Sequence, residues 1–429
     1  MRLQVLLWID SVLDREPGKD IDMKHIEGGI CAAKGFKASG IHCGIRKGRT
    51  KRDLALIVSE TRAAAAGVFT QNLVKGAPVV LSIQNLKDGH ASAVICNSGN
   101  ANTCNANGME IARGMCDLVE KYLQIDHEDV IVASTGVIGQ EMSLGPMVYG
   151  MQELVDALSD TPQASKDAAE AIMTTDTKLK EIAVEFELDG KTCRMGAISK
   201  GSGMIHPNMA TMLCFMTCDA AISPALLQKA LSENVVDTYN MVSVDRDTST
   251  NDTLTIMCNG LAGNAEIIDE QSDDYAEFKR ALFECTSYLA RATAADGEGA
   301  TKLIECTVTG AKDKATAKVL AKSVICSPLV KAMIFGRDAN CGRVMCALGY
   351  AGVPFDVKDT SVTLRSEVGS VLVCHSGNGL AFDEDRALMV LDADEIYIDI
   401  SVGNGEGTAT AWGCDLTYDY VKINGDYRT

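Results

Sequence analysis

Near its middle the chain reads Lys200-Gly-Ser-Gly-Met-Ile-His-Pro-Asn-Met-Ala-Thr-Met-Leu-Cys214. Gly201 and Gly203 permit backbone angles that other residues avoid, and Pro207 fixes φ and removes an N–H donor. The stretch is therefore predicted to be a shaped loop, and neither a helix nor a paired strand. A β-compatible run begins at Thr211, so this threonine lies where the loop passes into a strand.

A threonine in this position raises the question of whether the Ala210-Thr211 peptide bond stays intact. A hydroxyl in a strained loop can attack the preceding carbonyl, and Ala210 is small enough to leave that carbonyl approachable. Hydrolysis of the resulting ester would leave a chain that begins at Thr211, whose α-amine can act as general base for its own hydroxyl. An α-amine with a reference pKa of about 7.7 to 8.0 is partly neutral near pH 7. Alone, Thr211 also fits a β-branched residue that merely opens a strand.

The stretch resembles the self-cleavage motif of the ornithine acetyltransferase family, Lys-Gly-Ser-Gly-Met-Ile-x-Pro-x-Met-Ala-Thr-Met-Leu. Further segments resemble that family in the same order, from about residue 22 to the last residue, and together they are too long for chance to explain. They are Lys34-Gly-Phe-Lys-Ala-Ser-Gly40, Ala66-Gly-Val-Phe-Thr70, Asn97-Ser-Gly-Asn-Ala-Asn102, Ser134-Thr-Gly-Val-Ile-Gly139, Met173-Thr-Thr-Asp176, Asp296-Gly-Glu-Gly299 and Ala409-Thr-Ala-Trp-Gly-Cys-Asp-Leu-Thr-Tyr-Asp419.

This resemblance implies an α+β protein of the N-terminal-nucleophile type, with layered sheets in the middle and helices outside. It implies transfer of acetyl from N2-acetylornithine to glutamate in arginine biosynthesis, without a cofactor or a metal. Thr211 would be the nucleophile that carries the acetyl group, and Thr135 with Gly136 would form the oxyanion hole. The residues implied in substrate binding are Thr174, Lys200, Thr211, Glu298, Asn424 and Thr429.

Within that set, the resemblance directs Lys200 toward a substrate carboxylate and Glu298 toward an ammonium group. Thr174 stands beside Thr175, and the sequence does not exclude a shift by one residue. The two fragments are expected to stay together, in an α2β2 heterotetramer. The family contains members that also use acetyl-CoA as donor and members that do not, and no residue here decides between them.

Two other classes of function stay open at this point. An N-terminal threonine with an oxyanion hole also suits an amidase or aminopeptidase, in which water takes the acyl group. A binding protein without catalysis would instead remain a single intact chain. On the first reading the chain divides into an N-terminal extension at 1–21, to which we assign no function, and segments 22–210 and 211–429.

Composition argues against several other classes. At 429 residues the chain is long for one domain. A net charge of −18 argues against nucleic acid or an anionic membrane as the main partner. Sixteen cysteines spread over a long chain favour reduced thiols in a cytoplasmic protein, and the six histidines show no metal-binding spacing. The N-terminal apolar run is too short for a secretory signal, and no stretch approaches the roughly 20 apolar residues of a membrane span.

Patterns of apolar residues predict the main elements. Short β-compatible runs predict sheet from residue 23 to residue 80, and residues 93–96 and 129–133 read as buried strands. Alternation over residues 184–188 leads into Asp189-Gly190, a strong hairpin signal, and the return strand enters the Lys200 loop. Helices are predicted at residues 111–122, 164–172 and 275–291, and after Ser223-Pro224. Gly403-Asn-Gly-Glu-Gly407 is predicted to be a turn between strands, because it lacks the context of a phosphate loop.

Several site residues have a second interpretation. Ser134-Thr-Gly136 offers the hydroxyl and the backbone N–H that an oxyanion hole requires, but it is also common turn chemistry. The asparagines of residues 97–107 fit either a loop that starts a helix or a role in shaping the active site. Glu298 lies in a glycine-flanked turn, where a charge is usually solvated. The tail from Tyr418 would ordinarily fray, whereas the resemblance orders it into the substrate site.

Overall fold

The structure is a computed structural model that describes residues 23–46, 48, 50–206 and 212–426. Its strands are β1 Lys24–His25, β2 Phe36–Ile41, β3 Leu54–Phe69, β4 His90–Asn100, β5 Val130–Val137, β6 Lys180–Leu188, β7 Lys191–Lys200, β8 Leu213–Cys218, β9 Val242–Ser243, β10 Thr253–Cys258, β11 Leu303–Ala311, β12 Ser361–Ser366, β13 Gly369–His375, β14 Asn378–Gly379, β15 Glu395–Ser401 and β16 Gly407–Cys414. Its helices are α2 Ala77–Asn85, α3 Gly108–Leu123, α4 Gly145–Asp156, α5 Pro162–Ile172, α6 Pro224–Val235, α7 Asp273–Ala295, α8 Lys314–Ile325, α9 Pro328–Gly336, α10 Cys341–Gly349, α11 Glu384–Asp392 and α12 Tyr418–Gly425.

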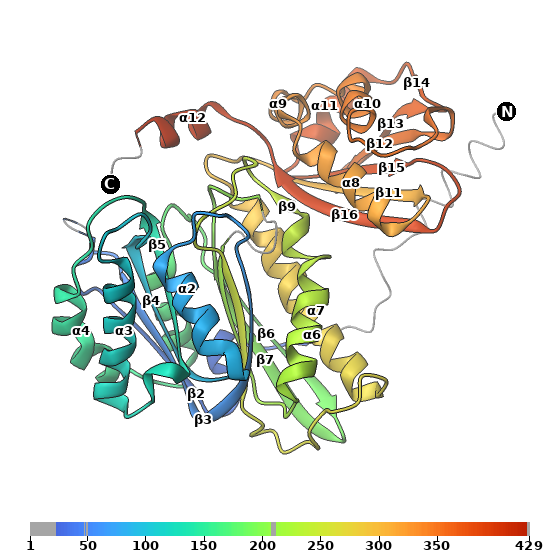
Figure 1. The fold of residues 1–429 in the computed structure, drawn as a ribbon. Coiled ribbons are helices and arrows are strands. Elements are labelled where there is room, and N and C mark those ends of the chain that lie inside the picture. The colour runs from blue at the N-terminus through green and yellow to red at the C-terminus, as the bar shows by residue number, and fades with distance from the viewer. Residues whose placement is uncertain (1–22, 47, 49, 207–211, 427–429) are drawn as a thin grey trace.

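The first sheet folds into two layers because its longest strand belongs to both. The order is β1-β6-β7-β8-β10-β3-β4-β5, with β2 paired to β3. The first half of β3 pairs with β2 and β4, and residues 64–69 pair with β10. One layer therefore holds β2, β4 and β5, and the other holds β1, β6, β7, β8 and β10 (Figure 1).

Three apolar cores hold these layers between helices, because successive residues of a strand face opposite sides of the sheet. The inner core joins the two layers and includes Ile131, Ala133, Ile198, Leu213 and Phe215. A second core packs β3, β4 and β5 against α2, α3 and α4. A third packs the other layer against α6 and α7. The order of layers is thus helix, sheet, sheet, helix, which confirms the predicted α+β fold of sheets covered by helices (Figure 1).

A second sheet continues the third core. Its order is β14-β13-β12-β15-β11-β16-β9, and α8 packs on β11 and β16. The apolar side chains of this sheet belong to the same cluster as those of α7, so the two sheets share one core. Within the described residues, no single helix is long and apolar enough to cross a membrane. Helices α8 and α9 meet that test only as a pair, which is bent by 56°.

Most predicted elements are present, with some corrections. The hairpin at Asp189-Gly190 joins β6 to β7, and both turn residues have positive φ, as a two-residue hairpin requires. The predicted sheet from residue 23 to residue 80 is wrong at its end, because α2 begins at Ala77 with proline in its first turn. Ser223 stands at the N-cap of α6, but its side chain makes no capping hydrogen bond. Strands β8 and β10 pair with β7 and β3, so residues on both sides of the predicted cut build the first sheet.

Candidate active site

Lys200 and Thr135 face each other across the inner core. Lys200 ends β7 on the same face as Ile198, and Thr135 lies near the end of β5 on the same face as Ile131 and Ala133. The Lys200 Nζ lies 3.4 Å from the Thr135 Oγ1. Two strands that are separated by four others in the sheet order thus bring these side chains together, because the sheet is folded into two layers.

Gly136 can only be glycine in this backbone. Its φ is +131°, and a Cβ there would lie 2.3 Å from the carbonyl carbon of Gly99 on β4. The register of the parallel pair places Gly99 directly beside Gly136, so the two chains approach closely at the end of both strands. This close approach needs a residue without a side chain. The sequence Thr135-Gly136 is therefore shaped by β4 as well as by β5.

Asparagines support the Thr135 strand end from both neighbouring segments. The Ser134 hydroxyl donates to Asn97 Oδ1 at 2.6 Å, and Asn97 Nδ2 donates to the Asn100 carbonyl at 2.9 Å. From across the sheet, Asn251 Nδ2 donates to the carbonyls of Ser134 and Ala101 at 2.9 and 2.6 Å. Asn97 and Asn100 therefore support the Thr135 strand end, whereas Asn102 Nδ2 donates to the carbonyl of Gly108 at the start of α3 at 2.8 Å, so each predicted alternative holds for part of the segment. Asn107 does not cap α3 with its side chain.

Lys200 is a buried cation with an altered acidity. Only 7% of the residue is exposed, and burial lowers the pKa of its ammonium group, although Asp176 acts in the opposite direction. Asp252 lies close enough to interact electrostatically with Lys200, but burial raises the pKa of this carboxyl group well above its usual value. Neither Asp252 oxygen accepts a hydrogen bond from the part of the chain that the structure describes. Asp252 therefore acts on Lys200 from beyond ion-pairing distance.

Asp176, Lys180 and Asp296 form a buried group of three charges, which we call the ion triad. The Lys180 Nζ lies 2.8 Å from Asp176 Oδ1 and 2.6 Å from Asp296 Oδ2, and none of the three side chains is more than 3% exposed. Asp176 also accepts from the backbone N–H groups of Gly201 at 2.7 Å and Thr174 at 3.0 Å. The ion triad thus joins the Thr174 segment, the start of the Lys200 loop and the end of α7.

The charge of Asp176 is secured by its partners. Burial alone would raise the pKa of this carboxyl group, but the ammonium groups of Lys200 and Lys180, together with the Gly201 N–H, hold the pKa far below its usual range. An isolated buried carboxylate would be costly, and this one is paired and hydrogen-bonded. Asp176 is therefore a fixed negative charge beneath the site.

Glu298 lies at the meeting point of three segments. Its Oε1 accepts from the Thr175 hydroxyl at 2.7 Å, and its Oε2 accepts from Asn424 Nδ2 at 2.8 Å. A Cβ at Gly203 would lie 2.2 Å from the Glu298 carboxyl carbon, so a side chain there would displace this carboxyl group. Glu298 is 8% exposed. The predicted alternative of a solvated turn residue is wrong, and helix α12 carries Asn424 to this carboxylate.

The two adjacent threonines have different roles. The Thr175 hydroxyl binds Glu298 and lies 2.7 Å from the Ser202 hydroxyl. The Thr174 hydroxyl makes no hydrogen bond to any residue that the structure describes, while its backbone N–H is held by Asp176. Thr174 is therefore the one of the two whose side chain is available to a ligand.

The segment before the predicted cut is held by residues that follow the cut. The Asp245 carboxylate accepts from the N–H groups of Met204 at 2.7 Å and Ile205 at 2.9 Å. The Thr248 hydroxyl donates to the His206 carbonyl at 2.9 Å. Ala210, Thr211 and Thr429 lie outside the described residues, and so the predicted nucleophile, cleavage site and terminal binding residue are not placed.

Sequence reasoning did not identify the residues that hold the site together. Asp176 of the ion triad lies inside one of the family motifs. Lys180 lies in a strand, where a polar residue is common and does not indicate a site. Asn251 was missed because its partners lie far away in sequence. Clusters of this kind carry no periodic signal, since they depend on the register between distant strands.

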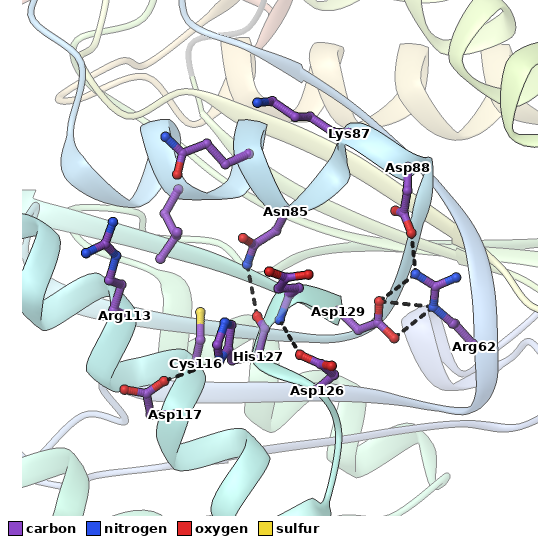
Figure 2. Close-up of a pocket in the computed structure, with 13 residues that line it drawn as sticks. Arg62, Asn85, Lys87, Asp88, Arg113, Cys116, Asp117, Asp126, His127 and Asp129 are labelled. Atoms are coloured by element: carbon purple, nitrogen blue, oxygen red, sulfur yellow. Dashed lines mark hydrogen bonds and ion pairs between the residues drawn. The ribbon is translucent and has the colours of Figure 1, made fainter.

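A separate hollow lies elsewhere on the molecule. It has a volume of about 820 Å³ and is lined by residues of α2 and α3, by Arg62 of β3 and by the turn at residues 126–129 that precedes β5, including several carboxylates (Figure 2). Within it, Arg62 Nε lies 2.8 Å from Asp129 Oδ2, and Asn85 Nδ2 donates to the His127 carbonyl at 3.0 Å. Thr135 is at the opposite end of β5, about 20 Å away at the usual rise of a strand. We call this surface the charged hollow.

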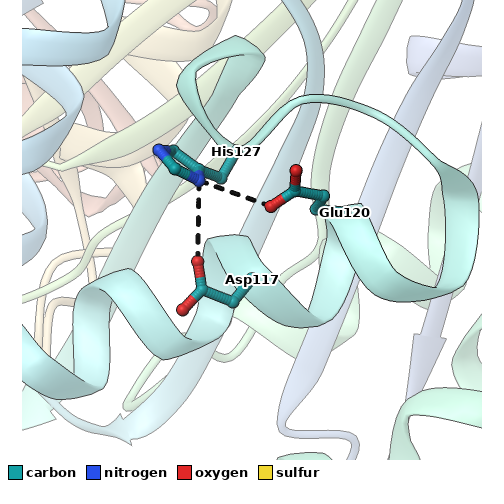
Figure 3. Close-up of side chains that lie close together, drawn as sticks. All are labelled: Asp117, Glu120 and His127. Atoms are coloured by element: carbon teal, nitrogen blue, oxygen red, sulfur yellow. Dashed lines mark hydrogen bonds and ion pairs between the residues drawn. The ribbon is translucent and has the colours of Figure 1, made fainter.

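One group beside the charged hollow has the residue types of a metal site. The His127 Nδ1 lies 3.3 Å from Glu120 Oε2 and 3.7 Å from Asp117 Oδ1 (Figure 3). The three side chains are 48 to 63% exposed. Exposed pairs of this kind are common and contribute little. The positions of these three side chains are accounted for by their contacts with one another, and a bound metal ion is not needed to explain them.

Comparison with known proteins gives consistent matches. The ArgJ family matches residues 37–429 of the chain. The arginine biosynthesis bifunctional protein ArgJ of Caldanaerobacter subterraneus is 50% identical over 408 residues, which cover 95% of this chain and 100% of that protein. The crystal structure of the arginine biosynthesis bifunctional protein from Bacillus halodurans is 42% identical, with a TM-score of 0.47, and covers 49% of this chain and 97% of that one. A Mycobacterium tuberculosis ornithine acetyltransferase, solved in complex with ornithine, is 34% identical, with a TM-score of 0.41, and covers 44% of this chain and 100% of that one.

Proposed function

Because the chain belongs to the ArgJ family, we propose that it transfers acetyl from N2-acetylornithine to glutamate through an acetyl-Thr211 intermediate. The observation that carries the proposal is the position of Lys200. Its buried ammonium group faces Thr135, and the Asp176 that accepts from the next residue also holds Thr174. The family resemblance assigned Thr135 to an oxyanion hole, and Lys200 and Thr174 to substrate binding. The contacts above link all three residues.

The reaction begins with attack on the acetyl carbonyl. The Thr211 hydroxyl forms the new C–O bond, its proton passes to its own α-amine, and the carbonyl oxygen becomes negatively charged. The Thr135 hydroxyl and the Gly136 N–H donate to this oxygen. Breaking the C–N bond releases ornithine, whose nitrogen takes the proton from the α-amine, and leaves acetyl on Thr211. The amine of glutamate then attacks the ester in the reverse sense and leaves as N-acetylglutamate.

One set of residues would serve both amino acids in turn. Acetylornithine and glutamate share an α-carboxylate, which Lys200 would attract, and Glu298 would attract an ammonium group. The free hydroxyl of Thr174 supports a third contact. We include Asn424 and Thr429 in this set, and the hydrogen bond from Asn424 to Glu298 supports the place of the C-terminal helix beside the substrate.

The nucleophile would be created by self-cleavage between Ala210 and Thr211. Retention of the first fragment is supported by the contacts of Asp245 and Thr248 with residues 204–206, because these bonds do not depend on the peptide bond that is cut. We further propose that the fragments assemble as an α2β2 heterotetramer in the cytoplasm. Size-exclusion chromatography with light scattering would report the mass of that assembly.

Intact mass spectrometry tests the proposal directly. Purified protein should give two fragments that meet at Ala210-Thr211, and incubation with acetylornithine should add one acetyl group to the fragment that begins with Thr211. Thr211→Ala should give one full-length chain without acetylation. Persistence of a single active wild-type chain would falsify self-cleavage.

Steady-state kinetics test the order of events. Initial rates against acetylornithine at several glutamate concentrations should give parallel lines in a double-reciprocal plot, because ornithine leaves before glutamate enters. Converging lines would mean that both amino acids are bound together. Ornithine release that does not depend on glutamate would instead favour the amidase or aminopeptidase.

A second activity is favoured by the names of the relatives. They are bifunctional proteins of arginine biosynthesis, and acetyl-CoA is the donor that would make N-acetylglutamate without acetylornithine. We propose that acetyl-CoA also acylates Thr211. The test is the formation of N-acetylglutamate from acetyl-CoA and glutamate alone, and its absence would leave only the transfer from acetylornithine.

A further inference from the structure

The contact between Lys200 and Thr135 has a direction. A protonated amine carries three N–H donors and no lone pair, so in the 3.4 Å contact Lys200 donates and the Thr135 oxygen accepts. A threonine hydroxyl has one proton, and that proton cannot point at an ammonium group that is itself donating. The Thr135 hydroxyl is therefore left to donate to another acceptor.

Lys200 is available for this contact because the neighbouring carboxylates are committed elsewhere. Asp176 binds Lys180 and the backbone, and Glu298 binds Thr175 and Asn424. Among the described residues, no carboxylate lies within ion-pairing distance of the Lys200 Nζ, although several act on it from farther away. Burial of an ammonium group that touches no carboxylate among the described residues is costly, and the position of Lys200 beside Thr135 therefore requires an explanation.

We propose that Lys200 is a positioning residue for the oxyanion hole, because its donation to Thr135 turns the hydroxyl proton of that threonine toward the reacting oxygen. This inference rests on the proposed function and deepens it. Lys200 need not touch the reacting atoms for this role, and no described residue other than Thr135 accepts from its Nζ, so its remaining N–H donors can serve a substrate carboxylate.

Deprotonation of Lys200 would reverse the contact. A neutral amine has a lone pair, so the Thr135 hydroxyl could donate to it and would be lost to the oxyanion hole. Burial lowers the pKa of Lys200, while Asp176, Glu298 and Cys96 oppose that shift and Lys180 adds to it. The neighbouring Asp252 also interacts with this charge. Since the active form is the protonated one, kcat should fall as pH rises through a pKa below that of an ordinary lysine.

A double-mutant cycle tests the proposal. Thr135→Val removes the hydroxyl and keeps the shape of the side chain, and Lys200→Met removes the charge and keeps most of the length. In the wild-type background Lys200→Met should lower kcat for acetyl transfer about tenfold, within the usual range of coupled residues. In the Thr135→Val background the same change should cost less than about threefold. Rates are expressed per cleaved chain, as counted by intact mass spectrometry.

The matched control is Asn424→Ala, which alters the substrate-binding residues without touching Thr135. Its effect should be the same in both backgrounds. Equal effects of Lys200→Met in the two backgrounds would overturn the proposal and leave Lys200 as a binding residue only. Loss of acetyl transfer by the wild-type protein would instead contradict the proposed function, so the two failures are distinguishable.

The pH profile of kcat gives a second measurement that does not need a Lys200 variant. The alkaline fall seen with the wild type should be absent in Thr135→Val, because Lys200 then has no hydroxyl to direct. Lys200→Arg should also lose the alkaline fall, since a guanidinium group stays protonated and cannot accept. An unchanged alkaline fall in Thr135→Val would contradict the proposal.

Discussion

The ion triad and the charged hollow contain the same kinds of residue in opposite surroundings. In the ion triad, Asp176, Lys180 and Asp296 are at most 3% exposed and lie 2.6 to 2.8 Å apart. Beside the charged hollow, Asp117 is 63% exposed and His127 is 50% exposed, at 3.7 Å. Water screens the charges beside the charged hollow but not those of the ion triad. The same kind of ion pair therefore contributes a very different free energy in the two places.

The comparison shows that size and charge do not identify a functional site. The charged hollow has an open volume of about 820 Å³, and its Arg62 is already paired with Asp88 and Asp129 at the surface. At the candidate active site, buried charges fix three chain segments, and one cation, Lys200, is left facing an uncharged hydroxyl. A ligand finds fixed, desolvated groups there, which is the arrangement that catalysis uses.

The largest expected effect concerns the ion triad. Lys180→Met should lower the free energy of unfolding by about 3–5 kcal/mol, because Asp176 and Asp296 would then share a buried space without a cation. Urea unfolding with fitted slopes measures this. The matched control is Lys24→Met, which removes an exposed pair with Glu185 at 2.6 Å and should cost less than about 1 kcal/mol. Equal losses of unfolding free energy in the two variants would mean that burial does not strengthen the ion triad.

The next effect concerns the oxyanion hole. Thr135→Ala should lower kcat by roughly 10² to 10³ and leave folding nearly intact, which is the usual loss on deletion of one such donor. Cleavage is expected to slow as well, because attack on the peptide bond also creates a negative oxygen. The control is Thr192→Ala, an exposed threonine on β7, which should leave kcat unchanged. A kcat within a few-fold of wild type would make Thr135 only a turn residue.

A smaller effect is expected at the C-terminal helix. Asn424→Ala removes the donor to Glu298 and should raise KM for acetylornithine about tenfold, in line with hydrogen bonds to charged groups. The effect on kcat should be minor, because Asn424 does not touch Thr135. The exposed Asn378→Ala serves as control in the same initial-rate assay. An unchanged KM would mean that α12 packs beside Glu298 without contributing to binding.

The smallest effect is expected at the charged hollow. His127→Ala should change the free energy of unfolding by no more than about 0.5 kcal/mol and should leave kcat unchanged, because its partners Asp117 and Glu120 are exposed. Thermal unfolding and the initial-rate assay of the same preparation measure both. A clear loss of activity would show that the charged hollow belongs to the functional machinery, against the comparison made above.

The sequence by itself determined the local elements and the chemistry of the motifs. The Asp189-Gly190 hairpin, α3 and α5 followed from turn residues and apolar spacing, because these signals act between neighbours in the chain. The resemblance named the site residues in advance. Of these, the structure places Lys200 beside Thr135 and Asn424 beside Glu298, whereas Thr211 and Thr429 lie outside the described residues.

Only the tertiary structure decided how these residues act on one another. Lys200 meets Thr135 because β3 passes between two layers and turns the ends of β5 and β7 toward each other. The ion triad, the hydrogen bonds of Asn251 and the bond from Thr175 to Glu298 likewise join residues that are far apart in the chain. Their physical cause is the burial of polar groups, which must find partners wherever the fold places them, at distances along the chain that no local pattern records.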